Sequence, residues 1–140
     1  TLFQSLEVLQ HLHFELSRPT SSMFAHRCCE QSAALERHVC HYLVDLALLS
    51  TDNLRFSPSL QAASALCLAR VCLGVPSRWS AADTKRAGRL PTTACVEWLY
   101  EIMRRDTPKL RAVARKYATA ARCHASKVAT PERLPEPLFD

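Results

Sequence analysis

The chain has 140 residues, a length that corresponds to one domain of ordinary size. Leu and Ala together contribute 39 residues, whereas Val and Ile contribute nine. Because helices favour Leu and Ala while strands favour β-branched residues, this ratio excludes a β protein. Two glycines are also too few for a set of tight hairpins. The hydrophobic fraction of 48% excludes wholesale disorder, and we expect an all-α fold.

The net charge of +5 is unevenly distributed along the chain. Between Arg104 and Lys127, eight Lys or Arg residues accompany a single acid, Asp106, which gives a local charge of +7. Such an asymmetry indicates an acidic or phosphorylated protein partner or a nucleic acid near this segment, or else a basic helix face that is merely solvated. The basic side chains that we place on this possible partner-facing surface are Lys109, Arg111, Arg115 and Lys116.

Seven cysteines lie among helix-forming residues, without a signal-peptide pattern before them. No apolar run reaches the roughly 18 residues that a membrane span requires. A free cysteine behaves as a small buried hydrophobic residue, and cytosolic and nuclear compartments keep thiols reduced. We therefore expect an intracellular protein of the nucleus or cytoplasm, with reduced core cysteines and no membrane partner.

The first predicted helix covers residues 2–16, since an apolar residue recurs there every three or four positions. Residues 23–30 fit either a short helix or an ordered linker. A second stripe of the same spacing predicts a helix over residues 35–49. The leucines of the first stripe are Leu2, Leu6, Leu9, Leu12 and Leu16.

The third predicted helix, over residues 58–73, is the centre of the expected fold. Ser57 and Pro58 form a favourable start, because Ser caps free N–H groups and Pro fits the first helical position. Gly74 is a good C-terminal signal. A helix that is apolar nearly all round is surrounded by other helices. From Leu60 to Leu73 its polar residues are Gln61, Ser64 and Arg70, and we expect Arg70 to pair with the helix C-terminus or with an acid such as Asp45.

Three further helices are predicted after the central one. Residues 80–88 open with a capping-box pattern. A long helix begins at Pro91, with Trp98 facing the core and Tyr100 on the opposite side, toward solvent or a partner. Thr107 and Pro108 begin the basic last helix. Residues 131–140 contain three prolines and predict an extended tail.

A family resemblance emerges once these segments are in order. The stretch Tyr42–Arg70 contains a helix with a leucine-rich end, then Phe56, Pro-Ser and an alanine-rich buried helix. It resembles the second cyclin box of mitotic, A/B-type cyclins. The pair Lys116-Tyr117 and the following Ser126–Pro131 are similar to the motif that closes the B-type fold, so the resemblance is closest to the B-type.

The resemblance implies a five-helix cyclin fold, with a C-terminal cyclin-box domain over residues 1–130 and a central helix surrounded by amphipathic ones. It also implies a regulatory subunit that binds and helps to activate a cyclin-dependent protein kinase in cell-cycle control. In that family a first cyclin box makes most of the kinase contact, and we find no such box in this sequence.

Other classes of function have weaker support in the sequence. No nucleophile elbow, paired-carboxylate pattern or glycine-rich phosphate loop is present, so we expect no enzyme activity, catalytic residue or cofactor. His38 and His41 are three residues apart, but no zinc motif accompanies them, and surface histidines are the better interpretation. The alternative function is a cyclin-fold nucleic-acid-binding module of the transcription factor IIB type that uses the basic helix. The absence of interleaved aromatics there disfavours nucleic acid.

Overall fold

The structure is a computed structural model that describes residues 1–13 and 18–139. The described residues form α-helices, short 3-10 turns and loops, without a strand, which confirms the all-α prediction. Leu16 and Ser17, the predicted end of the first helix, lie outside the described residues. The helices are α1 (Leu2–His11), α2 (Ser21–Cys28), α3 (Ala34–Leu48), α4 (Pro58–Cys72), α5 (Ala81–Ala87), α6 (Thr93–Arg104) and α7 (Pro108–Lys116).

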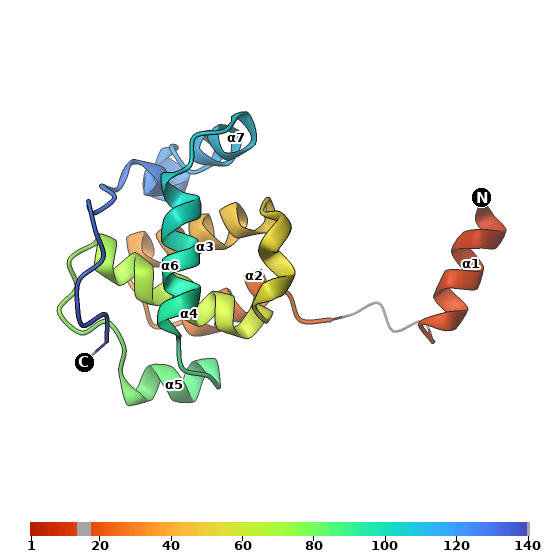
Figure 1. The fold of residues 1–140 in the computed structure, drawn as a ribbon, viewed down its shortest axis with the longest axis horizontal. Helices are drawn as coiled ribbons and strands as arrows, with labels where there is room; N and C mark the ends of the chain where they lie inside the picture. The colour runs from red at the N-terminus through yellow and green to blue at the C-terminus, as the bar shows by residue number, and fades with distance from the viewer. Residues whose placement is uncertain (14–17, 140) are drawn as a thin grey trace.

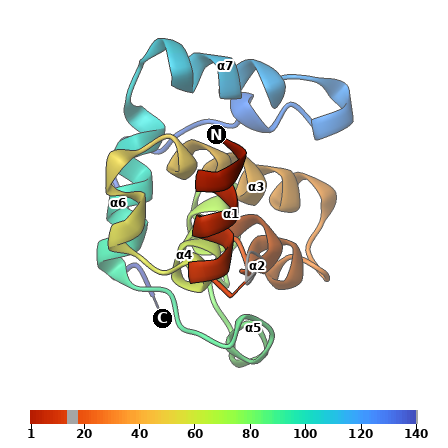
Figure 2. The same ribbon diagram turned by 90° about the vertical axis from the view of Figure 1, so that its right-hand side faces the viewer.

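The central helix of the bundle is α4, as the sequence predicts (Figures 1 and 2). Ser57 caps it by accepting a hydrogen bond from the Leu60 N–H at 3.4 Å, and Pro58 occupies the first helical position. Every residue from Leu60 to Ala69 is buried. After α4, Gly74 adopts a left-handed conformation with φ of 69° that a residue with a Cβ rarely adopts. The apolar sequence therefore produces a helix with neighbours on all sides.

Helices α2, α3 and α6 supply the walls around α4. Gln61, on α4, is fully buried and links three segments. Its amide oxygen accepts a hydrogen bond from the Ser21 hydroxyl at 2.9 Å, and its amide nitrogen donates to the carbonyl oxygens of Asn53 and Phe56 at 2.7 and 2.9 Å. A buried amide costs free energy unless it is satisfied, so these bonds hold α2 and the loop after α3 in register with α4.

Helix α1 differs from our prediction. Its leucine stripe is not in the core: Leu2 is 83% exposed and Leu12 is 47% exposed. In Figure 1, α1 lies apart from the other helices. The position against α4 is taken instead by α2, whose Ala25 and Cys28 are buried. The spacing identifies an amphipathic helix correctly, but it does not specify which surface the apolar face contacts.

A buried ionic cluster joins α3, α4 and α5. The Arg70 guanidinium donates two hydrogen bonds to the Asp83 carboxylate, at 2.6 and 3.1 Å, and a further one to Glu36. Asp83 also accepts bonds from the backbone N–H and the hydroxyl of Ser80, both at 2.8 Å, which completes the predicted capping box of α5. The predicted Asp45 partner of Arg70 is wrong, because Glu36 and Asp83 are the carboxylates that face the end of α4. Asp45 lies farther along α3 and accepts from Lys116 and Tyr117 instead.

The position of Tyr100, between helix α6 and the C-terminal segment, also differs from our prediction. Helix α6 begins at Thr93, two residues beyond the predicted start at Pro91, with Thr92 as its cap, and Trp98 is buried as predicted. Tyr100 is buried as well, rather than facing solvent, and its hydroxyl donates to the carbonyl oxygen of Pro131 at 2.6 Å. Residues 131–139 contain no helix and lie against the bundle, where Leu138 is buried. Tyr100 is therefore covered by a segment that follows it by about thirty residues.

All seven cysteines have free thiols, and five of them are buried. Burial raises the pKa of Cys28 to about 11 and that of Cys67 to about 12, so these thiols stay protonated at neutral pH. They pack as small apolar side chains. Within the described residues, no helix is both long and apolar enough to cross a bilayer.

Candidate partner-binding surface

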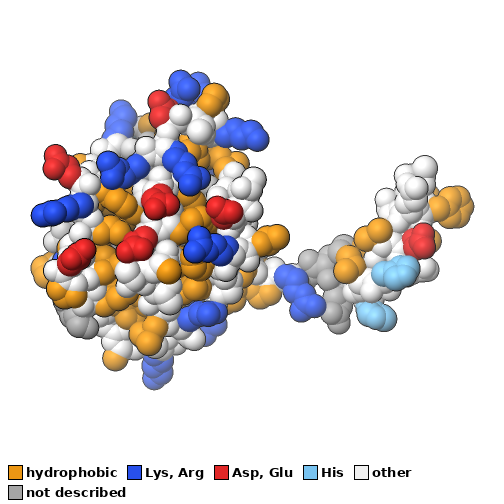
Figure 3. Space-filling model, in the orientation of Figure 1, with side chains coloured by type: hydrophobic (Ala, Val, Ile, Leu, Met, Phe, Trp, Pro, Cys, Tyr) orange, Lys and Arg blue, Asp and Glu red, His pale blue; other side chains and the backbone are white. Residues whose placement is uncertain are grey.

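The basic helix α7 begins at Pro108, where Thr107 caps it by accepting a hydrogen bond from the Leu110 N–H at 3.3 Å. All four basic side chains predicted for the partner-facing surface are exposed. Figure 3 shows Lys and Arg side chains at the end of the molecule where α7 lies. At about 100° per residue, Arg111 and Arg115 share one flank of α7 and Lys109 and Lys116 share the other. The structure thus divides the predicted set into two pairs.

Lys116 belongs to a contact that attaches α7 to α3. Its Nζ lies 3.1 Å from Oδ2 of Asp45, and the Tyr117 hydroxyl donates to the same oxygen at 2.6 Å. The rings of Tyr117 and Tyr42 are 5.4 Å apart. Burial, the hydrogen bond to Asp45 and the charge of Asp45 raise the pKa of Tyr117 well above its usual value. Lys116 and Tyr117 therefore contribute to structure at this edge of the bundle.

The other flank of α7 borders an apolar groove. The segment after α7 turns back and lies beside it, so that the Ser126 hydroxyl donates to the Ala114 carbonyl oxygen at 2.6 Å. The groove has a volume of about 550 Å³. The residues that line it are Pro108, Arg111, Ala114, Arg115, Ala118, Ser126 and Lys127. Lys127 is not among the surface residues that we predicted. The one feature of the sequence that could have identified it is its place in the basic segment between Arg104 and Lys127.

Three of the six histidines lie on another surface, between α2, α3 and the end of α7. His26, His38 and His41 line a pocket of about 400 Å³ together with Arg37 and Arg122. Burial and the two arginines lower the pKa of His38, and burial lowers the pKa of His41 in spite of nearby Asp45. Both rings therefore favour their neutral form. Among the described residues, no three His, Cys, Asp or Glu side chains are grouped to hold a metal ion.

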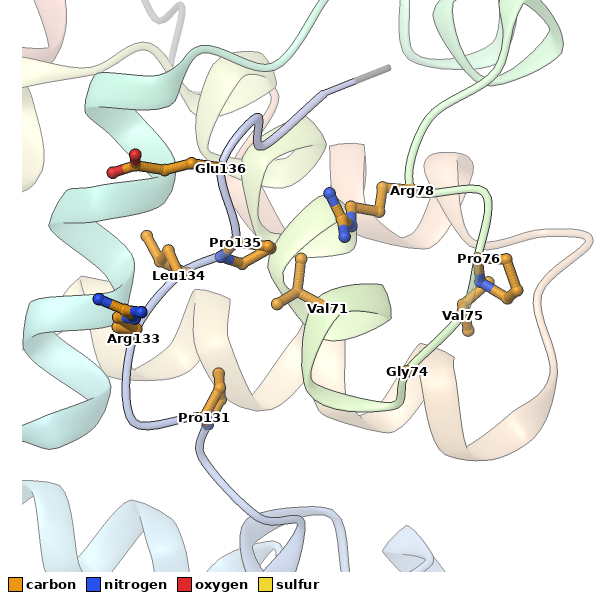
Figure 4. A pocket seen from close by; sticks show the side chains of 10 residues that line it. All are labelled: Val71, Gly74, Val75, Pro76, Arg78, Pro131, Arg133, Leu134, Pro135 and Glu136. Carbon is orange, nitrogen blue, oxygen red and sulfur yellow. The ribbon is translucent and has the colours of Figure 1, made fainter.

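A third cavity, of about 710 Å³, lies between the end of α4 and the C-terminal segment (Figure 4). Arg78 extends toward that segment, and its guanidinium donates to the carbonyl oxygens of Pro137 and Leu138 at 2.9 and 3.2 Å. Arg78 is therefore engaged in holding residues 131–139 against the bundle. Leu134 and Pro135 line the opposite wall.

Comparison with known proteins connects this architecture to a family. The profile of the cyclin C-terminal domain matches residues 19–131. The chain belongs to the cyclin family. The match begins after α1, and it includes the bundle built on α4 as well as the basic segment. The matched region is the C-terminal domain of cyclins.

Relatives of both mitotic types resemble this cyclin domain. Cyclin-A1-2 of Arabidopsis thaliana is 34% identical over 94% of this chain, and Cyclin-B1-3 of the same plant is 31% identical over 82%. The G2/mitotic-specific cyclin-B2 of Rana japonica is 42% identical over 50% of this chain. The aligned parts are 32%, 29% and 18% of those relatives, so the chain spans a third of their length or less.

Proposed function

We propose that this cyclin domain is part of a regulatory subunit that binds a cyclin-dependent protein kinase and supports its activation during cell division. The observation that carries the proposal is the match to the cyclin C-terminal domain over residues 19–131. The A-type and B-type relatives, one of them named as G2/mitotic-specific, give it a place in the cell cycle. The alternative of a nucleic-acid-binding module is not favoured by these relatives.

The mechanism that we propose is binding rather than chemistry, with no cofactor. The kinase is contacted mainly through a first cyclin box, and this C-terminal box supports that box and presents outer surface to substrates or regulators. A bundle with a fully buried central helix is suited to this role, because close packing makes a rigid scaffold. The proposed place of action is the nucleus or the cytoplasm, where thiols stay reduced.

The test is a chimera in which residues 19–131 replace the C-terminal box of a plant A-type cyclin. The measured quantity is the kinase activity of a purified cyclin-dependent kinase with the chimera, compared with the same cyclin truncated after its first box. We expect the chimera to activate the kinase more than the truncated cyclin does. The matched control carries Arg70→Met in the chimera, which disrupts the buried cluster and removes the gain.

A folded chimera that activates no better than the truncated cyclin contradicts the proposal. Gel-shift measurements on the 140-residue chain examine the alternative, since phosphate binding weakens steeply as salt increases. Salt-sensitive DNA binding, together with a failed chimera, would favour the nucleic-acid function.

A further inference from the structure

The groove beside α7 combines an apolar floor with a cationic rim. Ala114 and Ala118 are half-buried and form the floor with Pro108. The exposed side chains of Arg111, Arg115 and Lys127 surround it. A ligand that fits both features carries at least one apolar side chain and several negative charges.

The wall opposite α7 is held in place by local bonds. Cys123 and His124 both adopt left-handed backbone conformations, with φ of 54° and 51°, and together they reverse the chain direction. His124 Nδ1 lies 2.6 Å from the Ala118 carbonyl oxygen, and the Ser126 hydroxyl donates to the Ala114 carbonyl oxygen. Left-handed backbone is unfavourable for residues other than glycine and persists where the surroundings determine it. The groove is consequently formed in advance of any ligand.

The rim charges are available to a ligand. Among the described residues, no carboxylate lies within ion-pair distance of Arg115 or Lys127. Arg111 has one partner, Asp106, at 3.0 Å, but the two side chains are 63% and 78% exposed. Such an exposed ion pair contributes little to the free energy of folding, so a ligand carboxylate can replace Asp106 at a small cost in free energy. Lys116, on the other flank, is already paired with Asp45.

We propose that this groove, formed by Arg111, Ala114, Arg115, Ala118 and Lys127, binds a short acidic segment of a partner protein through an apolar side chain and flanking carboxylates. This part of the chain is almost entirely basic, since Asp106 is the single acid between Arg104 and Lys127, and its charge is therefore complementary to that of an acidic segment. Nucleic acid is a poorer occupant because the groove has no exposed aromatic ring for base stacking, and Tyr117 is buried. This binding goes beyond the kinase role and does not depend on it.

The experiment measures fluorescence anisotropy of labelled probes with the 140-residue chain. The main probe is a peptide in which two Leu residues are flanked by Glu and Asp. A second peptide has Ser in place of both Leu residues, a third has phosphoserine in place of the flanking acids, and the fourth probe is single-stranded DNA of equal charge. We expect the Leu-containing acidic peptide to bind at least about tenfold more tightly than the Ser peptide and than DNA.

Two variants locate the site and one serves as a control. Arg115→Glu should weaken binding of the main probe by about tenfold, because it reverses a rim charge. Ala118→Leu should weaken it by occupying the floor without changing the charge. Lys85→Glu makes the same kind of charge reversal on α5, where Lys85 is exposed, and should leave the affinity within about twofold. Circular dichroism establishes that each variant is folded.

Several outcomes would overturn the proposal. These are the absence of binding, equal affinity for the Leu and Ser peptides, tighter binding of DNA, or equal effects of Arg115→Glu and Lys85→Glu. Tighter binding of the phosphoserine peptide, with the Leu dependence retained, would support the groove and identify phosphate as the preferred anion.

Discussion

Helices α4 and α7 begin in the same way and have opposite environments. Each has a hydroxyl cap followed by proline, Ser57-Pro58 in α4 and Thr107-Pro108 in α7. Helix α4 is buried over ten consecutive residues, whereas α7 contains no buried residue. The cap determines where a helix starts, and the apolar pattern after it determines how deeply the helix lies in the fold.

The arginines of the two helices illustrate the same difference. Arg70 of α4 is enclosed by the carboxylates of Glu36 and Asp83, and its charge is used within the fold. Arg115 of α7 is exposed beside an apolar groove. Residues of one type thus have different roles because burial and partners differ, and substitutions can separate the two roles.

The largest expected effect is that of Arg70→Met. It leaves Asp83, which is 3% exposed, without its main partner, and breaking a buried ion pair costs about 3–5 kcal/mol. Arg115→Met is the matched control on α7 and should change the free energy of unfolding by less than about 0.5 kcal/mol. Urea denaturation measures both values. Similar values for the two variants would contradict the distinction between a structural and a surface arginine.

The next effect is that of Leu66→Ala in the middle of α4. Leu66 is fully buried, so the substitution leaves a cavity and should lower the free energy of unfolding by about 2–5 kcal/mol. Leu54→Ala is its control, since Leu54 is 95% exposed. We expect the control to be nearly neutral in thermal denaturation. A neutral Leu66→Ala would mean that α4 is not the centre of the core.

A pH dependence is expected from the buried cluster. Burial alone would raise the pKa of Asp83, but hydrogen bonds from Arg70 and Ser80 outweigh it and lower the pKa from 3.8 to about 2. This carboxylate therefore contributes stability above pH 3.8 that is lost as the pH falls toward 2. The contribution is roughly 2 kcal/mol. Unfolding measured across this range should show a shallower pH dependence for Asp83→Asn, and an unchanged slope would show that Asp83 does not titrate in this way.

The smallest effect is expected at the edge of the bundle. Tyr117→Phe removes the hydrogen bond to Asp45 and should cost about 1 kcal/mol. Because the pKa of Tyr117 is raised, its contribution is present below pH 10 and is lost at more alkaline pH. Tyr42→Phe is the control, since the pKa of Tyr42 is raised by burial alone. The tyrosinate absorbance of the variants during alkaline titration identifies which ring titrates last.

The sequence by itself determines the features that depend on neighbouring residues. The all-α fold class follows from the amino-acid composition, and the burial of α4 follows from its apolar run. The caps at Ser57 and Thr107 follow from the Ser-Pro and Thr-Pro pairs. The resemblance to cyclins follows from the order of such local motifs along the chain, and the profile match confirms it.

Only the tertiary structure decides which faces meet. The leucine stripe of α1 has the spacing of a core helix, yet the shorter α2 occupies the position against α4. Arg70 pairs with Glu36 and Asp83 rather than Asp45, and Tyr100 lies beneath Pro131. Lys127 joins Arg111 and Arg115 at the groove because the chain reverses after α7. The periodicity of a helix specifies that one of its faces is apolar or basic. Which element packs against that face depends on contacts between residues far apart in the sequence, and local spacing does not encode these contacts.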